Sequence, residues 1–140
     1  MDLSIIIVSF NTRDKLRKCL RSIFDSETKY SFEVFVVDNA SADGSAAMVE
    51  KDFSRVKLTK NSENVGFSRA NNIVLRDRVS KYILLLNSDI IVMPDTIQKM
   101  MEYMDANSDV GIASCRVEKP DGRLDLASRR SFPDPLNAFF

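Results

Sequence analysis

The chain has 140 residues, of which 44% are hydrophobic, and it carries 20 basic and 20 acidic side chains. That length and apolar content suit one domain with a buried core. The zero net charge argues against nucleic acid or an anionic lipid surface as a partner held by a broad electrostatic field. The absence of histidine excludes Ser-His-Asp and Cys-His nucleophiles and histidine metal sites.

The two cysteines and the N-terminus bear on the compartment. Cys19 and Cys115 lie far apart without a CxxC or metal-ligand spacing, which favours two reduced thiols. Asp2 stands where a signal peptide needs basic residues, and no apolar run approaches the roughly 18 residues that span a bilayer. We therefore expect no membrane span and a cytoplasmic location. Any attachment to the inner face of a membrane would be made by chain beyond this sequence.

Apolar runs alternate with amphipathic stretches along the chain, as in repeated strand-helix units that build a mainly parallel sheet. β-branched runs predict the strands, and apolar residues at helical spacing predict the helices. The predicted strands are 3–10, 32–38, 55–60, 81–87 (a central strand) and 110–117, and the predicted helices are 13–24, 40–53, 66–79 and 94–107. We also expect Cys19, Phe53, Met100, Met101 and Met104 in the core.

The last part of the chain is less regular. A turn is predicted at 120–122, and beyond it the pattern fades. We therefore expect an α/β domain over residues 1–117, followed over 118–140 by the start of a second region.

Polar residues gather where the predicted strands end. They are residues 9–11, 38–39, 64–69 and 87–89. In an open parallel sheet, ligands bind beyond the carboxyl ends of the strands. We therefore expect the four groups to meet at one edge.

Asp38 ends the second predicted strand and has two readings. It belongs either to a turn in which Ser41 or Asp43 caps the next helix, or to a ligand site. An acid at this place holds a ribose in dinucleotide-binding folds. However, the first turn, SFNTRDK, lacks the glycines that such a fold places against a pyrophosphate, which argues against an NAD site.

The stretch NVGFSRANN contains a glycine and a cation at a predicted helix start. Gly66 suits a positive φ, which is a structural role by itself. Arg69 in the first turn opposes the helix dipole by about 0.3–1 kcal/mol. A phosphate between the cation and the helix end would remove that cost, although a surface arginine tolerates it.

Asp89 interrupts an apolar run, YILLLNSDIIVM, in which both sides look buried. A buried carboxylate costs several kcal/mol unless donors or a cation compensate it. One reading is a polar turn between a strand and a helix. The other is that Asp89, with the amide and hydroxyl before it, binds a hard divalent cation that bridges a diphosphate.

In order and spacing, five motifs resemble the inverting glycosyltransferases of family 2, which have the GT-A fold. The motifs are SIIIVSFN, FEVFVVDNASADGS, NVGFSRANN, YILLLNSDIIVMPD, and DVGIASCRV with RRSFP. The resemblance implies a Rossmann-like, three-layer α/β/α half that binds a nucleotide-diphosphate sugar, UDP- or dTDP-linked, for transfer to a saccharide or lipid-linked acceptor in cell-wall or polysaccharide synthesis. It also implies a divalent metal cofactor, Mn²⁺ or Mg²⁺.

The resemblance also assigns roles. Ser9 and Phe10 line the base pocket, Asp38 bonds the pyrimidine or its ribose, Arg69 approaches the diphosphate, and Asp89 matches the last acid of a D-x-D motif as metal ligand. The remaining nucleotide-binding residues are Asn64, Gly66, Asn87 and Ser88.

Two departures from the family limit what is expected of this chain. Asn87 replaces the first acid of the D-x-D motif, and no acid in the tail (Asp121, Asp125, Asp134) suits the catalytic base, which we expect beyond Phe140. A non-catalytic nucleotide-binding or interaction module of the same fold is the alternative. A phosphoacceptor domain is a further rival, but the first strand of this chain ends in Ser9-Phe10-Asn11 rather than in acids.

Overall fold

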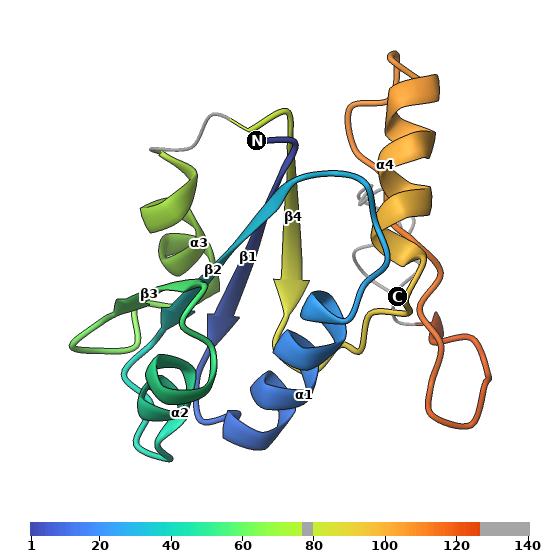
Figure 1. Ribbon diagram of the computed structural model, residues 1–140. Coiled ribbons are helices and arrows are strands. Elements are labelled where there is room, and N and C mark those ends of the chain that lie inside the picture. Colours follow the sequence, from blue (N-terminus) through green and yellow to red (C-terminus); the bar gives the residue numbers. More distant parts are fainter. Residues whose placement is uncertain (77–79, 127–140) are drawn as a thin grey trace, which may run out of the picture. The chain divides into compact units, whose positions relative to one another are not determined.

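A four-stranded parallel sheet with helices on both faces forms the body of the protein in the computed structural model, which describes residues 1–76 and 80–126 (Figure 1). Strands and helices alternate along the chain. They are β1 Leu3–Ser9, α1 Arg13–Phe24, β2 Phe32–Asp38, α2 Ser45–Asp52, β3 Val56–Lys60, α3 Phe67–Leu75, β4 Tyr82–Asn87 and α4 Thr96–Ala106. The predicted α/β class with a mainly parallel sheet is confirmed.

The strands lie in the order β3-β2-β1-β4. Every neighbouring pair is parallel, and Ser9 lies opposite Asp38 in the register. The prediction that residues 81–87 form a central strand is wrong for the part of the chain that the structure describes, in which β4 pairs with β1 alone and is an edge strand. Its alternate residues Ile83 and Leu85 are 42% and 48% exposed, since α3 packs on β1 and β2 rather than on β4.

Two apolar clusters separate the sheet from its helices. On one face, Ile5 and Val36 pack with the buried residues of α1, including Leu16 and Leu20. On the other face, the cluster of Ile6, Phe35, Val37, Ala70 and Val74 joins β1 and β2 to α3. Helices thus cover both faces of the sheet within Met1–Tyr103, and the predicted three layers are present.

The helix α1 has the predicted bounds, because Leu16, Cys19, Leu20 and Ile23 recur at helical spacing and are all buried. In contrast, α2 begins at Ser45 rather than at residue 40. The residues before it form a loop in which Ala40 and Gly44 have φ values of 64° and 82°, outside the helical range.

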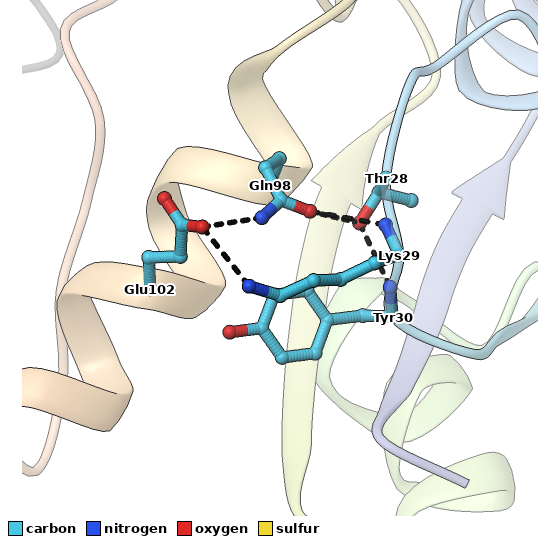
Figure 2. A network of polar contacts seen from close by, with 5 residues as sticks. All are labelled: Thr28, Lys29, Tyr30, Gln98 and Glu102. Atoms are coloured by element: carbon cyan, nitrogen blue, oxygen red, sulfur yellow. Dashed lines mark hydrogen bonds and ion pairs between the residues drawn. The ribbon is translucent and has the colours of Figure 1, made fainter.

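The loop that leads into β2 is held by a closed set of polar contacts to α4 (Figure 2). The Gln98 side-chain oxygen accepts hydrogen bonds from the Thr28 hydroxyl at 3.1 Å and from the Lys29 N–H at 3.0 Å. The Lys29 ammonium contacts Glu102 at 3.2 Å, and the Gln98 amide also donates to Glu102.

The core prediction holds for Cys19 and Met101, which are buried, whereas Phe53, Met100 and Met104 are half-buried. Both cysteines are free thiols, as predicted. Within the described ranges, no helix is both long enough and apolar enough to cross a bilayer.

The predicted strand 110–117 is wrong. Those residues join no ladder in the described part of the chain, and Ile112 is 93% exposed, because an apolar run becomes a strand only where a neighbour offers backbone partners. The predicted turn is confirmed by a 2.9 Å hydrogen bond from the Gly122 N–H to the Lys119 carbonyl.

The structure divides into two compact units, Met1–Tyr103 and Met104–Phe140. The predicted boundary at residue 117 stays a prediction. The motif RRSFP and Asp134 lie outside the described residues.

Candidate functional site

The four polar groups follow strand ends that lie in register. Asp38 pairs with Ser9 and Lys60, and Asn87 pairs with Val8. Since all four strands are parallel, residues 9–11, 38–39, 64–69 and 87–89 come together at the carboxyl edge of the sheet, as predicted.

Asp38 is 3% exposed, and its two carboxylate oxygens differ. Oδ2 accepts a hydrogen bond from the Ser41 N–H at 3.0 Å. Oδ1 is buried and has no hydrogen-bond partner among the described residues. An unpaired buried acceptor costs about 1–3 kcal/mol, so Oδ1 is suited to receive a donor from a ligand.

The prediction that Ser41 or Asp43 caps α2 is wrong, because the N-cap is Gly44 and makes no side-chain cap hydrogen bond. Asp43 instead holds the loop just before the helix. Its carboxylate accepts hydrogen bonds from the N–H and hydroxyl of Ser45 and, at 2.8 Å, from the Arg13 N–H. Burial acts to raise the pKa of Asp43, but the hydrogen bonds from Ser45 and Arg13 outweigh it and lower that pKa below its ordinary value. Asp43 thus joins the loop before α2 to the start of α1 as an ionised group.

Asn11 ties the same two loops together. It has a positive φ of 53°. Its N–H donates to the Ser41 hydroxyl at 2.9 Å, and its side-chain oxygen accepts from the Ala42 N–H at 2.8 Å. The loops after β1 and β2 therefore form one rigid platform beside Asp38.

Asn39 connects that platform to the loop before α3. This 2% exposed side chain donates to the Asn64 oxygen at 3.1 Å and the Gly66 carbonyl at 3.4 Å, and accepts from the Asn61 amide at 2.8 Å. The sequence placed Asn39 among the polar residues at the strand ends but indicated no role for it, because an asparagine after a strand looks like ordinary turn chemistry. The only signal was the pair of asparagines 22 and 25 positions later.

A chain of hydroxyls joins the ends of β1 and β4. The Ser9 and Thr12 hydroxyls lie 2.9 Å apart, and Thr12 donates to the Ser88 hydroxyl at 3.0 Å. Because Thr12 has one proton to donate, Ser9 must donate to Thr12. Ser9 and Ser88 are both buried, so Thr12, which the sequence reasoning missed, positions the segment that carries Asp89.

The expectation that Asp89 lies between two buried segments is wrong. Its side chain is 52% exposed, and among the described residues its one ion-pair partner is the Lys15 ammonium at 4.0 Å. The strand ends at Asn87, and the chain then turns, so that only Val92 of residues 90–93 is buried while Ile91 is 55% exposed. Solvent rather than a buried cation therefore compensates much of the Asp89 charge.

The charge of Asp89 nevertheless affects a buried group, the Cys19 thiol. Burial, with a smaller contribution from the Asp89 charge, raises the pKa of the Cys19 thiol to about 12. The Cys19 thiol lies 3.7 Å from the Asn87 carbonyl. This thiol is therefore neutral and structural.

The remaining predicted residues differ in exposure. Phe10 is 47% exposed, and Arg69 and Asn87 are also exposed. Gly66 has a φ of 82° as the N-cap of α3, which confirms its conformational role, and its N–H donates to the Asn64 oxygen at 3.0 Å. Among residues 1–76 and 80–126, the Arg69 guanidinium has no ion-pair partner, so its charge is available to an anion.

A divalent metal fits this edge only together with a ligand. The described residues contain no cluster of three or more acidic, cysteine or histidine side chains that could hold a metal. Asp89 supplies one exposed carboxylate, and Mg²⁺ is commonly held by one or two carboxylates plus substrate phosphates. The donor set therefore fits a cation shared between Asp89 and a diphosphate.

The family model described as glycosyl transferase family 2 matches residues 4–138. The chain belongs to this family. Among relatives, an uncharacterized glycosyltransferase of Bacillus subtilis, YfnE, is 32% identical over 102 residues, which cover 71% of this chain and 26% of YfnE. The succinoglycan biosynthesis protein ExoO of Rhizobium meliloti is 30% identical over 124 residues, covering 87% and 35%. The chain thus spans less than half the length of either relative.

The fold also matches solved structures. A Pyrobaculum calidifontis mannosyltransferase, PcManGT, in complex with GDP-Man and Mn²⁺, matches with a TM-score of 0.72 and 26% identity over 85% of this chain and 36% of its own. TarS of S. aureus, residues 1–349, matches in fold with a TM-score of 0.68 at 24% identity, covering 77% and 33%. The predicted GT-A type of α/β fold is confirmed.

Proposed function

We propose that the carboxyl edge of the sheet binds a nucleotide-diphosphate sugar, as the donor half of a glycosyltransferase of family 2. The unpartnered, buried Oδ1 of Asp38 carries this proposal. A pyrimidine N–H or a ribose hydroxyl is the kind of donor that this oxygen lacks. The family membership supports the same class of ligand.

Different residues around Asp38 would contact the base and the diphosphate of the nucleotide. Phe10, whose ring is 47% exposed, offers a face for the base above Ser9. Asn64 and Gly66 shape the loop that leads to Arg69 in the first turn of α3. Arg69 would approach the diphosphate from there. We place Asn87 and Ser88 beside the same diphosphate, since they immediately precede Asp89.

A divalent cation, Mn²⁺ or Mg²⁺, is part of the proposal. Asp89 would hold it from the protein side, and the bound cation would neutralise charge on the leaving diphosphate. The Mn²⁺ in the PcManGT complex supports this assignment. Asn87, in place of an acid, leaves the protein one carboxylate, so we expect weak, nucleotide-dependent metal binding.

Transfer itself requires more than the described residues supply. The acceptor hydroxyl forms a bond to the anomeric carbon while the bond to the diphosphate breaks, and a base takes the hydroxyl proton. We place that base beyond Phe140 and expect no transfer by this chain alone. A role in polysaccharide or cell-wall synthesis is supported by the names of ExoO and of the Bacillus subtilis protein TuaG, a putative teichuronic acid biosynthesis glycosyltransferase. A saccharide or lipid-linked acceptor and a site of action in the cytoplasm or at the inner face of the membrane are part of the proposal.

Titration calorimetry tests the proposal. UDP, dTDP and GDP are titrated into the 140-residue chain with Mn²⁺ or with EDTA, and into the variant Asp89→Ala. We expect a pyrimidine diphosphate to bind in Mn²⁺ and to bind far more weakly in EDTA, since the Asp89 carboxylate and the diphosphate otherwise repel one another. Asp89→Ala should lose the effect of Mn²⁺.

The outcomes separate the parts of the proposal. Equal affinity in Mn²⁺ and EDTA would remove the metal role of Asp89 and leave the nucleotide site. Preference for GDP would overturn the pyrimidine assignment alone. Sugar transfer by the purified chain would show that the base lies within it, and no binding of any nucleotide would favour an interaction module of the same fold.

A further inference from the structure

Basic side chains are concentrated on one helix of this neutral chain. Of the 12 residues of α1, the basic ones are Arg13, Lys15, Arg17, Lys18 and Arg21, and Asp14 is the only carboxylate before its C-cap, Asp25. The chain as a whole has 20 side chains of each sign. The excess is therefore local, and the apolar side of α1 is buried in the core, which leaves only its charged side for a ligand.

Two hollows lie along the side of α1 that faces α2. The first, of about 480 Å³, is lined by Arg13 and Arg17 of α1 and by Lys51 of α2. The second, of about 380 Å³, is lined by Arg21 and, after α2, by Arg55. They share Asp52 as a lining residue, and we call them together the α1–α2 groove.

The acids of the groove do not balance its cations. Besides Asp52, Asp25 is the one other carboxylate among the lining residues, against five cations. Asp52 lies 3.2 Å from an Nη of Arg17, whose Nε is buried and has no hydrogen-bond partner in the described structure. Like charges gathered in a concave surface concentrate a positive potential, which an anion would relieve.

Three further cations of the groove have no counter-ion. Within residues 1–76 and 80–126, no carboxylate comes within ion-pair distance of the side chains of Arg13, Arg21 or Lys51. Glu50, next to Lys51 in sequence, is instead paired with Lys60. The groove therefore offers several exposed guanidinium and ammonium groups without a counter-ion among the described residues.

The spacing of the arginines suits a ligand with more than one anionic group. Arg13, Arg17 and Arg21 recur every four residues, about 6 Å per step along the helix axis. A guanidinium can form bidentate hydrogen bonds to a phosphate, which an ammonium group cannot. The α1 helix starts just after β1, and its Arg13 N–H bonds to Asp43 in the loop that follows β2. One end of the groove therefore lies beside the carboxyl edge, and the rest extends along α1 away from that edge.

We propose that the α1–α2 groove is a second anion site, which binds a ligand with several phosphate groups through Arg13, Arg17 and Lys51. The phosphates come either from a soluble polyphosphorylated compound or from lipid headgroups. The site is independent of the nucleotide function proposed for the carboxyl edge.

Binding of tripolyphosphate and of inorganic phosphate to the 140-residue chain, measured by calorimetry at low salt, tests this site. We expect tripolyphosphate to bind more tightly than phosphate. Lys51→Gln removes an exposed charge of the groove, and Arg17→Lys keeps the charge but loses the guanidinium fork. Each should weaken tripolyphosphate binding about tenfold, the loss expected for one charge-assisted hydrogen bond.

Lys18→Gln is the matched control, because Lys18 is an exposed cation of the same helix that lines neither hollow. It should leave binding within about twofold of wild type, as expected for one exposed charge outside the site. Equal losses in Lys18→Gln and Lys51→Gln would reduce the effect to diffuse charge and overturn the site, as would no binding of tripolyphosphate or vesicles by the wild type.

Two more arms identify the source of the phosphate and separate the two sites. Sedimentation of the chain with vesicles of phosphatidylglycerol is compared with sedimentation with vesicles of phosphatidylcholine alone. Loss of phosphatidylglycerol binding in Lys51→Gln would identify lipid headgroups as the source of the phosphate. Binding of tripolyphosphate but not of vesicles by the wild type would identify a soluble ligand. UDP affinity should be unchanged in Lys51→Gln. A matching loss of UDP affinity would show that the groove is part of the nucleotide site and would overturn its independence.

Discussion

Polar side chains gather in two regions of the molecule, the loop that leads into β2 and the carboxyl edge formed by the loops after β1, β2 and β4. The two regions differ in whether their hydrogen bonds are complete. Before β2, Thr28, Lys29, Gln98 and Glu102 bond to one another (Figure 2). At the carboxyl edge, Asp38 keeps a buried oxygen without a partner. A closed set of polar contacts stabilises a fold, whereas an open one is prepared for a ligand.

The carboxyl edge also contains a closed part, which supports the open one. Asn39 and Asn11 make hydrogen bonds that fix the loops around Asp38, and Thr12 fixes Ser88. Sites of this kind need supporting residues that hold the binding groups in place. The difference between the two ends of the sheet can therefore be tested with substitutions matched in chemistry.

The largest effect is expected from Asn39→Ala. It removes three side-chain hydrogen bonds of a 2% exposed amide and leaves Asn61, Asn64 and Gly66 without them. We expect the free energy of unfolding to fall by about 2–4 kcal/mol in urea unfolding. Gln98→Ala, in the closed network before β2, should cost no more than about 1 kcal/mol, because its partners there remain open to water.

Nucleotide affinity extends that comparison. Asn39→Ala should also weaken UDP binding at temperatures where it is folded, whereas Gln98→Ala should not. Equal affinities in the two variants would mean that the order of the loop before α3 has no part in binding.

Asp38→Asn should act on affinity rather than on stability. The change keeps the size of the side chain and the acceptor for the Ser41 N–H, but removes the charge from the site. We expect UDP binding to weaken by about 1.5–3 kcal/mol, the contribution of a hydrogen bond to a charged group, with little change in Tm. A collapse of Tm with unchanged affinity of the folded fraction would assign Asp38 to the turn instead.

Thr12→Val and Thr28→Val form the closest matched pair, because each replaces a hydroxyl by a methyl group of similar size. Thr12 lies between Ser9 and Ser88, and Thr28 bonds to Gln98. We expect Thr12→Val to weaken UDP binding in Mn²⁺ by about 1 kcal/mol, and Thr28→Val to leave it unchanged. Thr12→Ser should restore binding, since it restores the hydroxyl. A loss in EDTA as large as in Mn²⁺ would contradict an effect through Asp89.

The smallest effect concerns pH. The pKa of Glu102 is lowered mainly by hydrogen bonds from Gln98 and Lys29, and that of Asp43 is lowered because hydrogen bonds from Ser45 and Arg13 outweigh burial. Because both pKa values are lowered in the folded protein, the two carboxylates stabilise the fold at pH values above their ordinary pKa values of 4.5 and 3.8. This contribution is lost as the pH falls through the lowered pKa of each group in the folded state. NMR titration of the carboxyl groups should show both midpoints below those ordinary pKa values. The midpoint of Glu102 should be the same with and without bound UDP. A midpoint at the ordinary value for either group would contradict its contacts.

Much of the secondary structure follows from local pattern. The bounds of α1 and β2 were predicted to the residue, because Leu16, Cys19, Leu20 and Ile23 mark a helix face and every residue of FEVFVVD except the two acids is β-branched or aromatic. The alternation of strands and helices as far as α4 and the turn at 120–122 were also predicted. These features depend on residues that are close together in the sequence.

The tertiary structure decided what depends on distant partners. Residues 110–117 have the composition of a strand but lack a neighbour to pair with, and β4 is an edge strand because of the order in which the chain adds strands to the sheet. Asp89 is exposed because the chain turns after Asn87, although the apolar residues on both sides indicate burial.

The same distinction applies to the candidate site. The sequence by itself determined which side chains follow strand ends, and hence that Asp38 and Ser9 share an edge. Only the folded chain showed that Asp38 Oδ1 lacks a partner, that Asn39 bonds to Asn61 and Asn64, and that Thr12 bridges Ser9 to Ser88. The physical reason is that a hydrogen bond depends on distances of about 3 Å between groups far apart in the sequence, and no pattern of residue types specifies such distances.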